Sequence, residues 1–104
     1  MENKYVLFFD GCSKGNPGKA GCGAVMYENN VEVFSKAVFV GKKETNNYAE
    51  YMGLIVGLEN AIIQNIKVLT VKGDSMLVIK QMNGLYKVKS PNLIPLFEFA
   101  KQLE

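Results

Sequence analysis

The spacing of apolar residues changes once along this chain, near Asn46, and this change constrains the fold more than any other feature. Before it, Tyr5 to Phe9 is a continuous apolar run, typical of a central strand covered on both faces. Gly21 to Tyr27 and Val31 to Val40 are two more β-prone segments, and Glu28-Asn29-Asn30 between them is typical of a hairpin turn. We therefore expect three antiparallel strands at the start of the chain.

After Asn46 the pattern becomes helical. Apolar residues recur at three- and four-residue spacing as far as Ile63, which predicts a helix of about four or five turns. Thr45, Asn46 and Asn47 supply residues that cap helix N-termini well. This helix would carry the chain from the antiparallel strands to its second half.

The second half adds one strand and two helices. Ile66 to Lys72 is a β-branched run of strand length, and a short helix that Gly84 can end follows it. Pro91 to Leu103 predicts a last helix, with Pro95 in its first turn. The order β-β-β-α-β-α-α predicts an α/β fold with a mixed sheet, in which the fourth strand lies parallel to the first.

Composition limits the class of protein. A chain of 104 residues with 48% apolar and 21% charged residues is expected to form one globular domain, residues 1–104. No segment approaches the ~20 apolar residues of a membrane span, and the start, Met-Glu-Asn-Lys, lacks the features of a signal peptide. We expect a cytoplasmic protein without a membrane partner.

The residue types restrict the chemistry further. The chain has no histidine, which excludes a Ser-His-Asp triad, a Cys-His pair and every His-ligated metal site. Its two cysteines, Cys12 and Cys22, are too few for a disulfide framework, although they could face each other across a hairpin. Any hydrolytic chemistry must therefore depend on carboxylates.

The only two aspartates follow strand-like runs. Asp10 ends the first run and Asp74 follows the fourth. If these two strands are parallel neighbours, their carboxyl ends meet, and open α/β sheets place their sites at such ends. A buried carboxylate without a partner costs several kcal/mol, so a compensating cation or another partner is expected at Asp10.

The glycine-rich segment Gly11 to Gly18 is predicted to be a loop. It does not fit a phosphate-binding loop, because Ala20 stands where Ser or Thr is needed and the next element is a strand instead of a helix. A wide hairpin loop remains the plain interpretation.

Each of the other two carboxylates has a structural alternative. Asn47-Tyr48-Ala49-Glu50 has the spacing of a capping box, in which Glu50 would bond the first amide of its own helix. If Asn46 caps the helix instead, Glu50 lies one turn inside it and is free to point at the sheet edge. Asp74, before Ser75 and an apolar helical run, could be an N-cap.

Three segments in the same order resemble the consecutive signatures of type 1 ribonuclease H. They are Asp10-Gly11-Cys12-Ser13-Lys14-Gly15-Asn16-Pro17-Gly18 with Gly21-Cys22-Gly23-Ala24, then Thr45-Asn46-Asn47-Tyr48-Ala49-Glu50-Tyr51, then Gly73-Asp74-Ser75-Met76-Leu77-Val78-Ile79. Lys87 to Leu93 is similar to the segment that leads into a later helix of that family. The resemblance covers the chain from Tyr5 onward.

The resemblance implies an endonuclease that cuts the RNA strand of an RNA/DNA hybrid with two Mg²⁺ ions, for which Mn²⁺ is a substitute. Carboxylates are hard oxygen ligands that suit Mg²⁺, and a two-metal site needs no histidine. By this resemblance Asp10 would bridge the ions, and Glu50 and Asp74 would each hold one. These three carboxylates are the predicted catalytic residues and metal ligands.

The resemblance also implies residues that contact the hybrid, because 2′-hydroxyls in the minor groove mark the RNA strand. The predicted substrate-binding residues are Gly11, Cys12, Ser13, Asn16, Thr45, Asn46, Asn47 and Ser75. Thr45 and Asn16 would bind a phosphate of the DNA strand. Looser attraction to the nucleic-acid backbone would come from Lys14, Lys42, Lys43, Lys87 and Lys89.

The chain departs from the family pattern in one respect that bears on catalysis. The family has a fifth strand followed by a helix with a fourth carboxylate, and this sequence contains neither. It could be a fragment, a short variant that completes its sheet by forming a homodimer at the open edge, or a non-catalytic relative. The alternatives to catalysis are a weak or inactive hybrid-binding module and a structural domain with no preference for hybrids.

Overall fold

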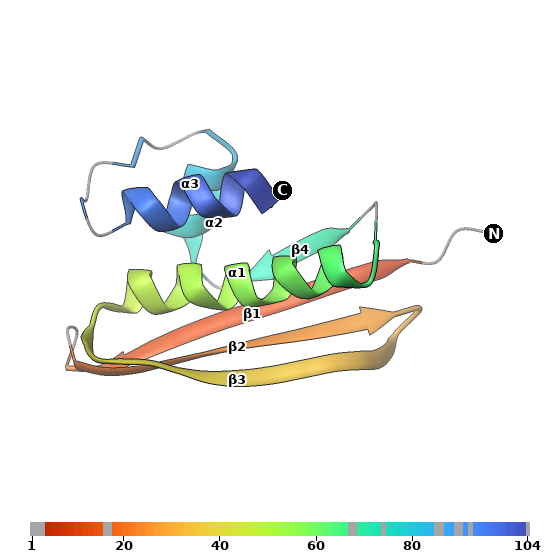
Figure 1. The fold of residues 1–104 in the computed structure, drawn as a ribbon, viewed down its shortest axis with the longest axis horizontal. Coiled ribbons are helices and arrows are strands. Elements are labelled where there is room, and N and C mark those ends of the chain that lie inside the picture. Colours follow the sequence, from red (N-terminus) through yellow and green to blue (C-terminus); the bar gives the residue numbers. More distant parts are fainter. Residues whose placement is uncertain are drawn as a thin grey trace.

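The elements of the chain follow one another in the predicted order β-β-β-α-β-α-α (Figure 1). The computed structural model describes residues 4–15, 18–66, 69–73, 75–84, 87–88, 91 and 93–103. Its elements are β1 (Tyr5–Lys14), β2 (Gly18–Glu28), β3 (Val31–Glu44), α1 (Asn46–Ile63), β4 (Thr70–Gly73), α2 (Met76–Met82) and α3 (Ile94–Leu103).

The four strands form one mixed sheet in the order β3-β2-β1-β4. β1 pairs antiparallel with β2 and parallel with β4, and β2 pairs antiparallel with β3. Asn29 and Asn30 join β2 to β3 with φ angles of 51° and 72°, as a tight hairpin turn requires. The predicted α/β class and the parallel fourth strand are therefore confirmed.

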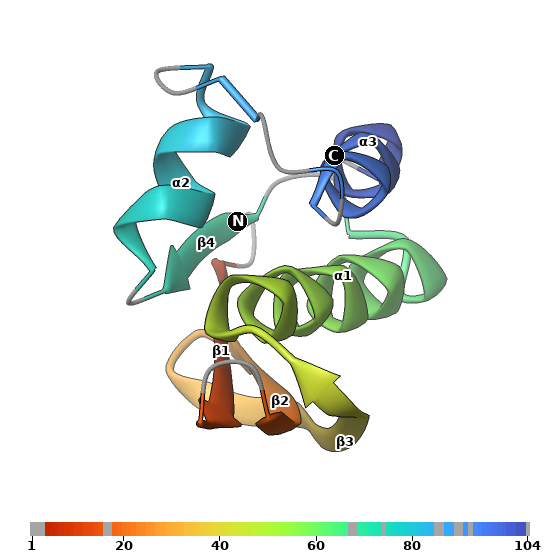
Figure 2. The ribbon, with the colours of Figure 1, turned by 90° about the vertical axis from the view of Figure 1, so that its left-hand side faces the viewer.

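The three helices lie on one side of the sheet, with α1 next to it (Figures 1 and 2). In β1 the side chains of Leu7 and Phe9 are buried towards α1, whereas Phe8 on the opposite face is 43% exposed. No element of the described ranges covers that opposite face, which we call the open face. The prediction that the first strand is covered on both faces is therefore wrong.

α1 packs closely on β1 because every fourth residue on its inner side is small. Ala49, Gly53, Gly57 and Ala61 are all buried. A Cβ atom on Gly53 would lie 2.6 Å from the carbonyl oxygen of Asp10, and one on Gly57 would lie 2.5 Å from the side chain of Leu7. Real Cβ contacts are essentially never this short, so glycine allows α1 its position on the strand.

The core between α1 and the other helices includes one buried polar contact. The side chain of Tyr51 is fully buried, and its hydroxyl donates a 2.5 Å hydrogen bond to Oε1 of Gln81 in α2. Burial raises the pKa of Tyr51 to about 12. Leu93, just before α3, and Ala100 in α3 belong to the same buried apolar cluster as Tyr51. Side-chain packing therefore holds α3 against α1.

Several predicted boundaries are wrong, and β2 and β3 are longer than predicted. Gly11 to Lys14 form the end of β1 instead of a loop, because each of them pairs with a residue of β2. β4 starts at Thr70, since the backbone N–H of Ile66 donates to the carbonyl of Ala61 and completes the end of α1. α3 starts at Ile94 and not at Pro91.

No helix within the described ranges is long and apolar enough to cross a membrane.

Candidate active site

The candidate site lies where β1 runs past the end of β4. The last pair between these strands joins Phe9 to Gly73, and β1 continues from Asp10 to Lys14 beyond it. Among the described residues, no pair between β1 and β4 follows Phe9 and Gly73. Asp74, the next residue in the sequence after Gly73, lies outside the described residues.

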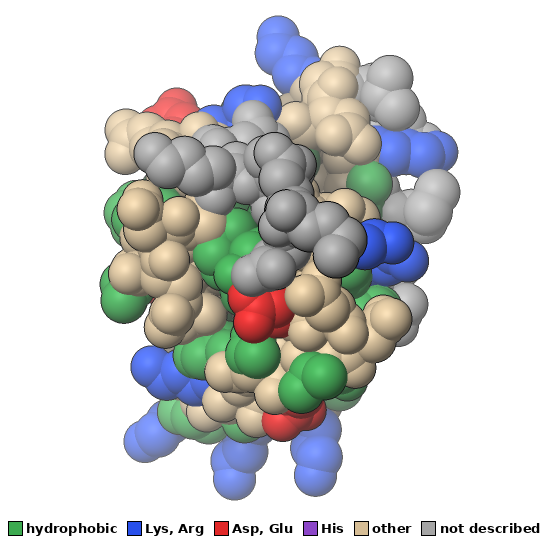
Figure 3. Space-filling view, turned by 90° about the vertical axis from the view of Figure 1, so that its right-hand side faces the viewer, with side chains coloured by type: hydrophobic (Ala, Val, Ile, Leu, Met, Phe, Trp, Pro, Cys, Tyr) green, Lys and Arg blue, Asp and Glu red, His purple; other side chains and the backbone are tan. Residues whose placement is uncertain are grey.

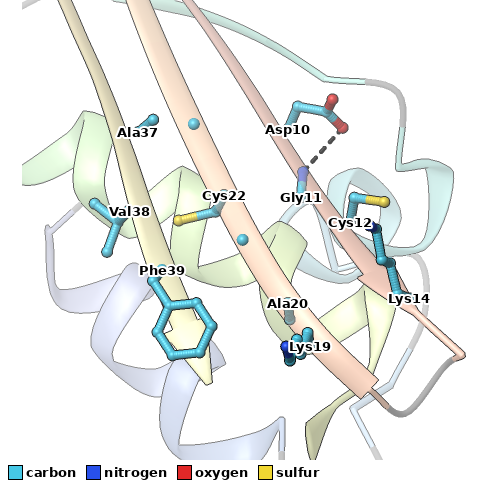
Figure 4. Close-up of a pocket in the computed structure, with 12 residues that line it drawn as sticks. Asp10, Gly11, Cys12, Lys14, Lys19, Ala20, Cys22, Ala37, Val38 and Phe39 are labelled. Atoms are coloured by element: carbon cyan, nitrogen blue, oxygen red, sulfur yellow. Dashed lines mark hydrogen bonds between the residues drawn. The ribbon is translucent and has the colours of Figure 1, made fainter. Parts of the chain in front are cut away.

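Asp10 points from β1 into solvent on the open face (Figure 4). Its Oδ1 atom accepts a 2.9 Å hydrogen bond from the backbone N–H of Gly11. The predicted substrate-binding residue Cys12 is exposed two residues further along the same face. Asp10 is thus an accessible carboxylate directly after the last described pair between β1 and β4.

Glu50 lies one turn inside α1 and is only 8% exposed, with its Oε2 atom buried. The N-cap of the helix is Thr45, whose Oγ1 accepts a 3.1 Å hydrogen bond from the N–H of Tyr48. The capping-box alternative, in which Asn47 caps the helix and Glu50 bonds back to it, is therefore wrong.

The backbones that carry Asp10 and Glu50 are in direct contact. A Cβ atom on Gly11 would lie 2.3 Å from the backbone nitrogen of Glu50 and 2.2 Å from the carbonyl carbon of Ala49. Sequence reasoning identified both carboxylates, but it missed Gly53, which contacts the Asp10 carbonyl from α1. The spacing of small residues along the helix was the available signal for that contact.

Ser13 and Asn46 fasten the end of β1 to the start of α1. The backbone N–H of Ser13 donates to Oδ1 of Asn46 at 2.6 Å, and the Ser13 hydroxyl donates to the carbonyl of Glu44 at 2.6 Å. Ser13 is buried, whereas Asn46 is exposed. Nothing in the sequence indicated this bond, because the two residues lie 33 positions apart.

The remaining predicted contact residues lie at the N-termini of two helices or outside the described ranges. Asn47 is in the first turn of α1, next to Asn46. Ser75 is the N-cap of α2, and its Oγ accepts a 3.3 Å hydrogen bond from the N–H of Val78. Because Ser75 takes this role, the alternative of Asp74 as the cap is wrong. Asn16 lies outside the described residues.

The two cysteines do not face each other. Cys22 pairs with Gly11 across the hairpin and points towards α1, whereas Cys12 pairs with Gly21 and points to the open face. Both thiols are free. Burial raises the pKa of the Cys22 thiol, so it has little thiolate character and packs as a small apolar side chain.

The donor set suits a hard divalent cation. Asp10 and Glu50 offer carboxylate oxygens from elements that touch, and oxygen is the ligand type that Mg²⁺ prefers. Within the described part of the chain, no group of three Asp, Glu, Cys or His residues could hold a metal ion. Two of the three predicted ligands are thus placed by this structure, and both fit the metal chemically.

Comparison with known proteins identifies the class of protein to which this chain belongs. Residues 8–104 match the family model described as reverse transcriptase-like. The N-terminal RNase H domain of a bifunctional protein from Mycobacterium tuberculosis, solved as a fusion with maltose-binding protein, has a TM-score of 0.92 and 41% identity. That match covers 98% of this chain and 74% of the solved chain.

Two other solved ribonuclease H structures are also similar to this chain. RNase H1 from Halobacterium salinarum has a TM-score of 0.89 at 35% identity over 96% of this chain and 76% of its own. LC11-RNase H1, isolated from compost and solved in complex with an RNA/DNA hybrid, has a TM-score of 0.87 at 34% identity over 96% of this chain and 75% of its own. The chain belongs to the type 1 ribonuclease H family.

The chain matches only part of its full-length curated relatives. It is 43% identical over 101 residues to the M. tuberculosis bifunctional protein, of which it spans 28%. It is 37% identical over 86 residues to ribonuclease HI of H. salinarum, of which it spans 43%.

Proposed function

We propose that this domain hydrolyses the RNA strand of RNA/DNA hybrids as a metal-dependent endonuclease. The observation that carries the proposal is the contact between Gly11 and Glu50, which brings together the backbones that carry Asp10 in β1 and Glu50 in α1. Family membership supports the reaction class, and the related LC11-RNase H1 was solved with an RNA/DNA hybrid.

Asp10, Glu50 and Asp74 would be the catalytic metal ligands, with Mg²⁺ as the ion and Mn²⁺ as its substitute. When bound, two such ions supply an activated water and stabilise the leaving oxygen. Asp10 presents its carboxylate to solvent, where a scissile phosphate can approach. Glu50 is held by the first turns of α1 against β1, so its carboxylate has little freedom to move. Histidine is absent from the sequence, and in this proposal the carboxylates and water supply the acid-base groups.

The surface around the two carboxylates would bind the hybrid across its minor groove, where 2′-hydroxyls distinguish RNA from DNA. The proposed contact residues are Gly11, Cys12, Ser13, Asn16, Thr45, Asn46, Asn47 and Ser75. The Ser13–Asn46 hydrogen bond supports this role, because it holds β1 and the start of α1 in one fixed surface. Thr45 and Asn16 would take a DNA-strand phosphate.

The test is cleavage of a hybrid labelled on its RNA strand, in Mg²⁺, in Mn²⁺ and in chelator, with duplex DNA and duplex RNA as competitors. We expect cleavage of the hybrid alone, and only with metal. Asp10→Asn should abolish it, whereas Glu59→Gln, an exposed carboxylate of the same helix α1, should leave it unchanged. Cleavage that survives Asp10→Asn would refute the proposal.

One observation favours a second candidate, a weak or inactive hybrid-binding module that forms a homodimer. β4 is the edge strand of the sheet within the described residues, and an unpaired edge is a template for another strand. Such a module would bind the hybrid without product in either metal and would run as a dimer in light scattering. A monodisperse monomer of 11.5 kDa would exclude the dimer.

A further inference from the structure

A shallow groove of about 660 Å³ runs along the open face from Asp10 to the tip of the β1–β2 hairpin (Figure 4). Its floor is formed by Gly21 and Gly23 of β2, which lie opposite Cys12 and Asp10. A Cβ atom on either glycine would meet its nearest atom at 3.5 or 3.6 Å, an ordinary contact. Packing therefore does not require glycine there, and glycine inside a strand often marks a place where a ligand approaches closely.

Two lysines stand at the hairpin end of this groove. Lys14 of β1 and Lys19 of β2 are direct cross-strand partners, and both are exposed. Like charges directly opposite each other on a sheet are destabilising. The residues that line the groove include one carboxylate, Asp10, which lies four pairs away along the ladder. The fold thus keeps an unfavourable cationic pair at the end of an open path that begins at Asp10.

We propose that the Lys14–Lys19 pair is a phosphate contact that holds the nucleic-acid backbone beyond the point of cleavage. The inference rests on the proposed function and adds a second contact to it. Asp10 and Lys14 are four residue steps apart along β1, which is ~13 Å at the rise of a β-strand. That length matches about four base-pair steps at 3.4 Å each, so one duplex reaches both places.

A polyanion fits this arrangement better than a small anion. The groove is open along its length, so an isolated phosphate at the lysine pair would gain nothing from the path to Asp10. A duplex gains from both ends, because a phosphate held at one end raises the local concentration of a phosphate at the other. Lys42 and Lys43, near the end of β3 opposite the Gly18–Ala20 segment, extend the same positive end of the sheet.

The test compares two double variants with equal loss of charge. Lys14→Gln with Lys19→Gln removes the pair. Lys4→Gln with Lys36→Gln is the matched control, because lysines occur on other parts of the surface too (Figure 3). Both of those residues are exposed and neither lines the groove. Binding of a 20-base-pair hybrid is measured against salt in an Asp10→Asn background, and unfolding without nucleic acid is measured in parallel.

We expect the pair variant to bind several-fold more weakly and its log-log salt slope to become shallower by about one to two, as for one or two lost phosphate contacts. Its folded state should be as stable as the parent's or slightly more so, since a like-charge contact has been removed. Lys14→Arg with Lys19→Arg should restore binding. In the Asp10-intact protein the pair variant should raise KM and leave kcat unchanged.

Four outcomes would overturn the inference. If the control and the pair variant lose binding equally, the lysines act only through net charge. If the parent binds and cleaves the hybrid while the pair variant matches it, the contact is wrong and the proposed function stands. If the parent binds no hybrid, or if inorganic phosphate alone saturates the lysine pair, the polyanion role fails, and the first of these results removes the proposed function as well.

Discussion

Gly11 touches Glu50: a Cβ atom on the glycine would lie 2.3 Å from the glutamate's backbone nitrogen. The strand that carries Asp10 and the helix that carries Glu50 therefore touch at Gly11, where there is no room for the Cβ atom that every other residue type has. This contact fixes how closely the backbones that carry the two proposed metal ligands approach each other. It follows that the site can be disturbed without changing either carboxylate.

Replacement of Gly11 by alanine should push α1 away from β1. Inserting a methyl group into a closely packed contact costs about 1–3 kcal/mol of unfolding free energy. We expect that loss in urea denaturation, together with slower hybrid cleavage under conditions where the variant is folded. Gly21→Ala is the matched control, because its Cβ has room at 3.5 Å. Equal loss of stability in the two variants would contradict the explanation.

Glu50→Gln should separate catalysis from folding. Removing a direct metal ligand should cost at least the roughly 10- to 100-fold in activity that loss of an indirect metal partner costs. The two side chains have nearly the same shape, and a buried carboxylate is itself costly, so stability should stay within about 1 kcal/mol of the parent. Cleavage assays at several Mg²⁺ concentrations and urea denaturation measure the two effects. Unchanged cleavage would exclude Glu50 as a ligand.

Thr45→Ala should destabilise the start of α1. The variant loses the side-chain oxygen that accepts the N–H of Tyr48, and such N-caps are worth about 1 kcal/mol. Thr45→Ser keeps a hydroxyl and should recover most of the loss. Denaturation without nucleic acid isolates this structural role from any contact with phosphate. A serine variant as unstable as the alanine variant would count against the capping role.

Stability should fall at high pH because of Tyr51. Its pKa is raised by burial from 10.0 in the unfolded chain to about 12 in the fold. Below pH 10 the hydroxyl is protonated in both states, and between pH 10 and 12 it ionises mainly in the unfolded chain. The free energy of unfolding should therefore be roughly 2–3 kcal/mol lower at pH 12 than below pH 10.

Tyr51→Phe tests this dependence. The variant should be less stable at pH 8 by about 1–2 kcal/mol, because Gln81 loses its buried donor. Its free energy of unfolding should nevertheless fall less than that of the parent between pH 9 and 11.5. The two proteins differ only at residue 51, so the difference in slope reports Tyr51. Parallel curves for the two proteins would show that the tyrosine does not titrate as expected.

Local patterns were enough to predict the order of the elements. The hairpin at Asn29 and Asn30, the long helix after Thr45 and the short helix after Ser75 each depend on neighbouring residues, and the structure confirms all three. The parallel position of β4 followed from the handed crossover through α1. Asp10 was singled out by its position after the first apolar run, and the roles of Asp10 and Glu50 as metal ligands followed from the resemblance to a family.

Features that depend on contacts between distant residues could not be predicted from the sequence. Gly11 to Lys14 have the composition of a loop, and only pairing with β2 makes them strand. The apolar run from Tyr5 to Phe9 cannot show whether a second layer covers it, and Phe8 is exposed. For Glu50, the choice between cap and site depended on which residue begins the helix, a difference of two positions between Thr45 and Asn47.

The row of small residues on α1 has a consequence for variation. In most cores, large side chains fix the distance between elements, and their replacement leaves cavities. Here the distance between the β1 and α1 backbones that carry the two carboxylates depends on missing side chains at Gly11 and Gly53, so the usual order of tolerance is reversed. Trimming a neighbouring apolar residue should weaken the domain and leave the geometry of the two carboxylates intact, whereas one added carbon should spoil that geometry in a domain that still folds.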